Sequence, residues 1–166
     1  MPAATPLDRT LDLLRIDWRP QHAPPSAARV LLATVVALVG SLLADALLVA
    51  LGKALFPSTK NYPHIVFSDY GKLTVIGVLI ACIGWPIVTR ISSSPRWLFF
   101  RLAIVVTLVL FLPDLYILKQ GQPAKAVAVL MCMHVAIALV TYNALVHIAP
   151  VRTEGARTGG PPAPAA

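Results

Sequence analysis

Charged residues are scarce in this chain. Lysine, arginine, aspartate and glutamate together make up 13% of its 166 residues, whereas soluble domains usually carry about 25%. Hydrophobic residues make up 57% of the chain, and its mean hydropathy is +0.75. This composition excludes an ordinary soluble domain, and the length leaves room for one helical bundle.

Cysteine is also scarce, and recognisable catalytic motifs are absent. Cys82 and Cys132 fall in two different apolar segments, without the C-x-x-C or cysteine–histidine spacing that metal sites use. We therefore expect both to be small buried side chains. The sequence shows no phosphate-binding loop, dinucleotide motif or paired nucleophile and base, so we expect neither catalysis, a metal nor a cofactor.

Four long apolar segments predict four membrane-spanning helices. At about 1.5 Å per residue, each can cross the hydrocarbon layer or most of it. The expected fold class is therefore all-α: a polytopic membrane protein whose four transmembrane helices form a bundle. The domain covers residues 27–150, and its expected spans cover residues 28–51, 73–89, 97–118 and 124–148.

Small residues indicate where these spans can approach one another. Gly40 and Ala44 lie four residues apart in the first span. Gly77, Ala81 and Gly84 share one face of the second span. Because small side chains let helix backbones come close in lipid, we expect both surfaces to pack within the bundle.

The segments outside the spans are polar. Residues 151–166 are rich in glycine, proline and alanine, which is typical of disorder. Within residues 1–26, apolar residues recur at helical spacing, and this predicts a short amphipathic helix over residues 6–18 at the membrane surface. A disordered tail is the alternative. The apolar positions of that helix are Leu7, Leu11, Leu14 and Trp18.

The distribution of basic residues predicts the orientation. With four spans, both tails share one side with the loop 90–101, and that side holds nine arginines, whereas the other side holds five lysines. The positive-inside rule then predicts that both termini lie in the cytoplasm, and the membrane we expect is a bacterial inner membrane. Although the formal net charge is +7, the basic residues flank apolar segments, which favours lipid headgroups over nucleic acid as partners.

Three ionisable residues fall inside the predicted spans at similar depth: Asp45, Asp114 and His134. Such residues are costly in lipid, and each shares a helix face with small or polar residues, so we expect the three to meet at the bundle axis. Two carboxyl groups and an imidazole can share a proton or hold a cation. A structural polar contact between helices is the alternative, and another is that Asp114 reaches the interface near Tyr116.

The small-residue stripes, the compact size and the lack of a catalytic motif favour a small accessory protein of a membrane complex. Its expected partners are the lipid bilayer and other membrane proteins, or a second copy of the chain. The alternative is a proton-coupled or small-solute transport unit built around Asp45, Asp114 and His134.

Three short segments resemble a known family. They are RISSSPRW at residues 90–97, LFLPDL at residues 110–115, and MCMHVAIALV at residues 131–140 with its Met-x-His pattern. They are similar to a family of small actinobacterial membrane proteins that is catalogued as a domain of unknown function. The resemblance covers about residues 28–150. It implies four transmembrane spans, and it carries over no known activity and no catalytic residues.

Overall fold

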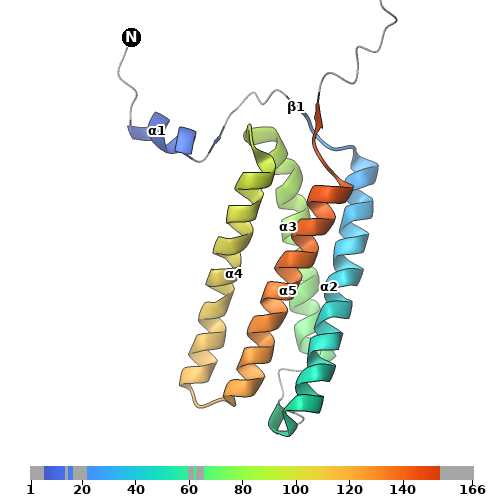
Figure 1. The fold of residues 1–166 in the computed structure, drawn as a ribbon, viewed down its shortest axis with the longest axis vertical. Helices are drawn as coiled ribbons and strands as arrows, with labels where there is room; N and C mark the ends of the chain where they lie inside the picture. The colour runs from blue at the N-terminus through green and yellow to red at the C-terminus, as the bar shows by residue number, and fades with distance from the viewer. Residues whose placement is uncertain (1–5, 14, 17–21, 60–61, 63–65, 154–166) are drawn as a thin grey trace, which may run out of the picture.

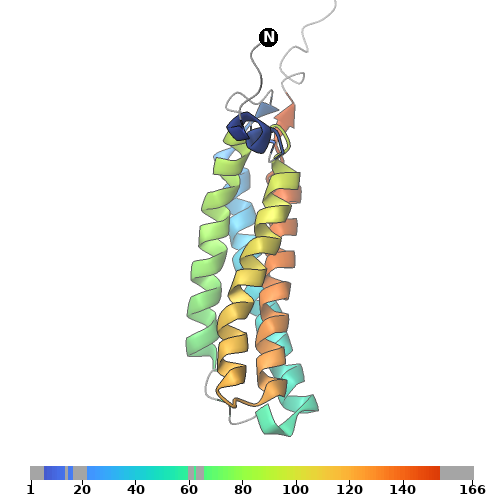
Figure 2. The same cartoon turned by 90° about the vertical axis from the view of Figure 1, so that its left-hand side faces the viewer.

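Four long helices form a single bundle in the computed structural model, which describes residues 6–13, 15–16, 22–59, 62 and 66–153. The helices lie side by side (Figure 1 and Figure 2). Each is long and apolar enough to cross a membrane, so the predicted all-α polytopic membrane fold is confirmed. The helices are α2 (Ala27–Leu55), α3 (Phe67–Ile91), α4 (Pro95–Lys119) and α5 (Ala124–Ile148).

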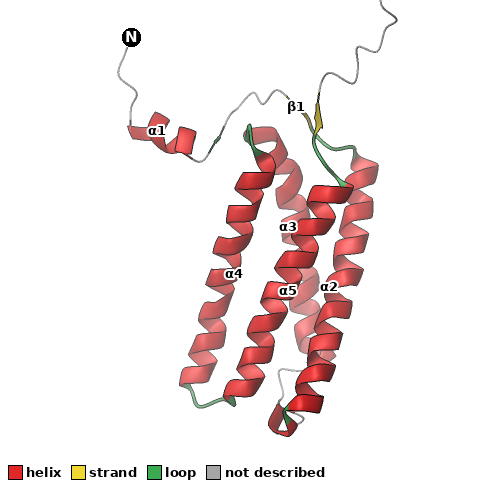
Figure 3. Ribbon diagram, in the orientation of Figure 1, coloured by secondary structure: helices red, strands yellow, loops and turns green. Residues whose placement is uncertain are grey.

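Short elements surround the ends of the bundle. The helix α1 (Pro6–Leu13) precedes it, and the 3-10 helix η1 (Pro57–Thr59) follows α2. The strand β1 (His22–Ala23) pairs antiparallel with β2 (Arg152–Thr153), beside the first residues of α2 and the last of α5 (Figure 3). The segments before α2 and after α5 are therefore joined at one end of the bundle.

The N-terminal helix is shorter than the predicted range of residues 6–18. It ends at Leu13, because Arg15 adopts a left-handed backbone conformation with φ +52° that a right-handed helix cannot continue. Leu14, Trp18 and the side chain of Leu7 lie outside the described residues. Of the predicted apolar positions, Leu11 is half-buried.

The helix α3 begins before the predicted second span. It starts at Phe67, six residues ahead of residue 73. Asp69 lies in its first turn, where the helix dipole favours an acidic side chain. The rings of Phe67 and Tyr70 also meet edge to face, with centroids 5.5 Å apart. These local contacts extend the helix past the apolar segment.

The centre of the bundle is the contact between α2 and α5, which is the most extensive between any two helices. A Cβ atom at Gly40 would lie 2.9 Å from Val140 Cγ1, and one at Gly52 would lie 2.8 Å from Val129 Cγ2. Only glycine allows this approach, so Gly40 packs within the bundle as predicted. The buried residues of α2 follow an i, i+4 pattern: Ala33, Ala37, Ser41, Asp45 and Val49.

The small-residue face of α3 is oriented differently from the prediction. A Cβ atom at Gly77 or Gly84 would meet nothing within 4 Å, so the expectation that these glycines let other spans approach is wrong. The helix instead turns the large Trp85 side chain into the bundle, where its indole Nε1 donates to Ala149 O at 2.8 Å. The buried face of α3 includes Tyr70, Thr74, Val78, Cys82 and Trp85.

The basic residues separate by type between the two ends of the bundle. One end, here called the arginine end, carries β1, β2 and the connection between α3 and α4. It holds the described arginines outside α1, namely Arg15, Arg29, Arg90, Arg96, Arg101 and Arg152. The opposite end, here called the lysine end, holds Lys53, Lys72, Lys119 and Lys125. The segregation that the sequence suggests is therefore present in three dimensions.

Candidate functional site

Asp45 is fully enclosed by protein. It lies on the buried face of α2 with none of its surface exposed. The hydroxyl of Thr74 on α3 donates to Asp45 Oδ2 at 2.6 Å, which is the short distance expected of a hydrogen bond to a carboxylate. Among the described residues, no donor lies on Asp45 Oδ1. The contact fixes α2 against α3.

A second polar contact links α2 to α5. The hydroxyl groups of Ser41 and Thr141 lie 3.4 Å apart, and both residues are buried. Ser41 stands one helical turn before Asp45, so the two contacts lie along one face of α2. Together they place polar groups between α2 and both of its neighbours.

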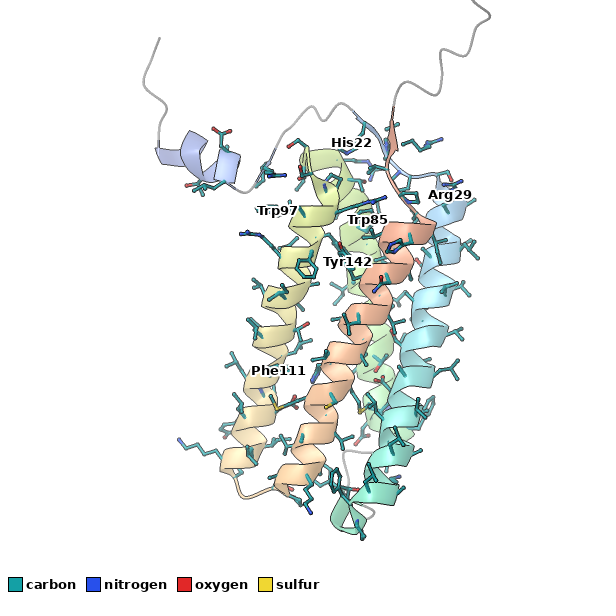
Figure 4. The ribbon with its side chains drawn as sticks, viewed as in Figure 1. His22, Arg29, Trp85, Trp97, Phe111 and Tyr142 are labelled. Carbon is teal, nitrogen blue, oxygen red and sulfur yellow. The ribbon has the colours of Figure 1, made fainter. Side chains whose placement is uncertain are left out.

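Asp114 pairs with His134 across the interface of α4 and α5. His134 Nδ1 lies 3.0 Å from Asp114 Oδ2. The side chain of Asp114 is 7% exposed and that of His134 is 27% exposed. The Phe111 ring meets the imidazole edge to face, with centroids 6.4 Å apart, and Figure 4 shows Phe111 on the side of α4 that faces α5. The imidazole is therefore held from two sides and remains partly open.

A shallow apolar groove lies beside this pair. It is lined by Phe111, Met131, Cys132 and Val135. Phe111, whose ring also meets that of His134, connects the lining of the groove to the Asp114–His134 pair. Its outer side faces the position that lipid would occupy around the bundle.

The structure thus joins two of the three predicted site residues. Asp114 contacts His134, whereas within the described part of the chain Asp45 forms neither a hydrogen bond nor an ion pair with either. Thr74 is the polar partner that sequence reasoning missed. The sequence does contain one indication of this role. Thr74 lies four residues from both Tyr70 and Val78, and this spacing places it on the same face of α3 as those large residues.

Tyr62 adds a further polar group at the lysine end. It is 5% exposed and packs in a cluster with Val49, Tyr70 and Met133. Burial, and then the negative charge of Asp114, raise the pKa of the Tyr62 phenol above its ordinary value.

The described residues contain no group of three or more histidine, cysteine or acidic side chains that could hold a metal ion. Cys82 is buried and Cys132 is exposed, and both are free thiols. The expectation of two buried cysteines is therefore wrong for Cys132, which lines the open groove at the surface of α4 and α5.

A comparison with known families matches residues 21–150 to the description "Family of unknown function (DUF6069)". The chain belongs to the DUF6069 family. The match confirms the resemblance to a family of unknown function, and it begins before residue 28, so that it includes β1. The search of curated proteins and the search of solved structures gave no match.

The two polar contacts of this DUF6069 chain differ in what they can do chemically. A threonine hydroxyl can hold the Asp45 carboxyl in place, but it does not ionise at physiological pH. An imidazole beside a carboxyl group can hold or pass a proton. The Asp114–His134 pair therefore combines two ionisable side chains, whereas Asp45 is the only ionisable group in its contact with Thr74.

Proposed function

We propose that this protein is a non-enzymatic accessory protein that binds a helix of another membrane protein within the bilayer. The observation that supports this function is the unoccupied face of α3. Gly77 and Gly84 stand seven residues apart on this face, and, apart from the adjacent backbone of α3 itself, no atom of the described residues lies within 4 Å of a Cβ built at either position.

Large apolar residues alternate with these glycines along the same face. Leu73, Ile80 and Ile87 are exposed at seven-residue spacing, and one glycine lies between each successive pair. We call Leu73, Gly77, Ile80, Gly84 and Ile87 the α3 seam. A seven-residue repeat of this kind suits a second helix that crosses at a small angle and places side chains over the glycines.

The two kinds of glycine in the bundle support this use of the seam. Gly40 and Gly52 are in close contact with side chains of α5, so their lack of a side chain is already used within the fold. Gly77 and Gly84 lower helix propensity by about 1 kcal/mol each relative to alanine. A partner helix would give these two residues the same role that α5 gives the glycines of α2.

We propose an actinobacterial inner membrane as the location, with both termini in the cytoplasm. This rests on the family resemblance of the three sequence motifs and on the count of basic residues, which is nine arginines on one side of the membrane and five lysines on the other. The proposed partners are the bilayer and one other membrane protein.

Site-specific crosslinking in the native membrane tests the seam. A photoreactive amino acid at Ile80 should give a discrete protein adduct. The matched control is Val105 of α4, which is also apolar and exposed but lies outside the seam. We expect Val105 to give no protein adduct, because lipid covers it.

A double substitution decides whether the glycines cause the contact. Gly77→Leu with Gly84→Leu should abolish the Ile80 adduct and leave the single chain folded, because both positions are open. An adduct of twice the chain mass would identify a second copy as the occupant and overturn the proposal of a different protein. Equal adducts at Ile80 and Val105, or persistence in the double variant, would refute the seam.

A second candidate function is proton-coupled or small-solute transport at the Asp114–His134 pair. The observation that favours it is the partly exposed His134 side chain beside the groove of α4 and α5. The burial of both carboxyl groups favours the accessory function, because a transported ion or solute would need a hydrated path to them.

A further inference from the structure

Arg15 is fixed onto the connection between α3 and α4. Ser92 Oγ and Ser93 N donate to Arg15 O at 2.9 and 3.2 Å, and Arg15 Nη1 lies 3.0 Å from the Ser94 hydroxyl to which it donates. Ile16 also forms an isolated bridge with Ser92. The segment after α1 is thus attached by backbone and side chain to three consecutive serines.

The backbone of Arg15 occupies a position that favours glycine. Arg15 N donates to Asp12 O at 3.0 Å and Ile16 N donates to Leu11 O at 2.9 Å, which is the hydrogen-bond pattern that closes a helix around a left-handed residue. Arginine adopts this conformation only with strain, and its φ is +52°. The arginine at this strained position holds its guanidinium group against the start of α4.

Two guanidinium groups meet at one tryptophan. The Cζ atoms of Arg15 and Arg101 lie 5.1 and 4.0 Å from the centroid of the Trp97 ring. Trp97 is in the first turn of α4, at the level where tryptophan anchors a helix in the headgroup layer, and Figure 4 shows it near the arginine end. Among the described residues no carboxylate lies within ion-pair distance of either arginine.

A shallow open cavity of about 280 Å³ lies at this point. Guanidinium and hydroxyl groups supply its polar side, and Trp97 supplies its apolar side. Planar guanidinium groups bind phosphate oxygens with two parallel hydrogen bonds. The cavity is lined by Arg15, Ser94, Pro95, Arg96, Trp97 and Val151.

We propose that this cavity binds the phosphate of an anionic phospholipid headgroup. The surface beyond the cavity suits acyl chains, because Ile104 and Leu108 continue the helix face of Trp97 and Arg101 and are exposed. A free phosphate ester would use only the polar half of this surface, whereas a phospholipid uses both halves. Juxtamembrane arginines attract such lipids electrostatically in general, and Arg15 adds a fixed position to that attraction.

Native mass spectrometry of the full chain in detergent tests the proposal. Phosphatidylglycerol should bind in preference to phosphatidylcholine with identical acyl chains. Arg15→Gly should lower the phosphatidylglycerol affinity at least about fivefold, the effect expected of one basic residue near an anionic surface. Glycine suits the left-handed position, so this variant preserves the backbone.

A control variant and a competition experiment distinguish a specific phospholipid site from general electrostatic attraction to anionic lipid. Arg90→Gln removes an exposed arginine of the same end that lies outside the cavity lining, and it should change the affinity less than twofold. An equal loss in Arg90→Gln and Arg15→Gly would overturn the site, as would an unchanged affinity in Arg15→Gly. Glycerol phosphate should fail to displace the lipid at equal concentration; displacement would assign the cavity to a soluble phosphate ester instead.

Discussion

Asp45 and Asp114 are both buried carboxyl groups within the bundle, and their surroundings differ in two ways. Asp45 has no exposed surface and accepts a hydrogen bond from a hydroxyl group. Asp114 faces an imidazole whose side chain remains 27% exposed. The comparison shows that burial at similar depth does not assign a role. Only Asp114 has a partner that can itself accept or release a proton.

The largest expected effect is the loss of stability on removing Asp45. Asp45→Ala should lower the free energy of unfolding by on the order of 2–3 kcal/mol, because it leaves the Thr74 hydroxyl without its acceptor and opens a cavity on the buried face of α2. Unfolding in mixed micelles measures this cost. Asp114→Ala should cost less, since its partner His134 is partly exposed; a larger cost for Asp114→Ala would contradict the comparison.

A smaller effect is expected for the coupling between Asp114 and His134. Because the two side chains are partners, the double alanine variant should cost less than the sum of the single variants by about 0.5–1.5 kcal/mol. Asp114→Ala combined with Thr74→Val is the control cycle. These residues are not bonded to each other, so their costs should add within about 0.5 kcal/mol. Additive costs for Asp114 and His134 would mean that the contact contributes nothing measurable.

No effect is expected in the third measurement, which is proton flux into liposomes. The parent protein should not exceed protein-free liposomes, because both carboxyl groups are buried in the bundle. The variants Asp114→Asn and Asp45→Asn sharpen the comparison if flux is found. Flux that Asp114→Asn abolishes and Asp45→Asn preserves would replace the accessory function with transport.

The existence of the four helices could be predicted from the sequence, because long apolar segments have few alternatives in lipid. The contact of Asp114 with His134 could be anticipated as well. The two helices are joined by the short turn at Gly121, so they must be antiparallel neighbours, and two ionisable groups in lipid favour each other over hydrocarbon.

The partner of Asp45 could not be predicted in the same way, because the rotation of α3 about its axis is weakly encoded. Apolar residues surround this helix on all sides, and the small-residue face looked like the packing face. The structure buries Trp85 and Thr74 instead. In an ordinary water-soluble helix the polar face would have settled this choice, but lipid accepts apolar residues on the outer side as readily as the core does.

The left-handed conformation of Arg15 could not be predicted either, because the residue that usually indicates such a position is glycine. The sequence showed the spacing of apolar residues across residues 6–18 but gave no sign that the helix would stop at Leu13. Arg15 is held in this conformation by hydrogen bonds that Ser92 and Ser93, far along the chain, donate to its carbonyl oxygen. Such long-range contacts cannot be read from local sequence.

The extensive contact between α2 and α5 has a consequence for biosynthesis. During translation α2 enters the membrane before α3, α4 and α5. Thr74 can cover Asp45 as soon as α3 is inserted, whereas Ser41 must wait for Thr141 on α5. The nascent chain therefore carries an uncovered polar group, the Ser41 hydroxyl, on α2 until α5 is inserted.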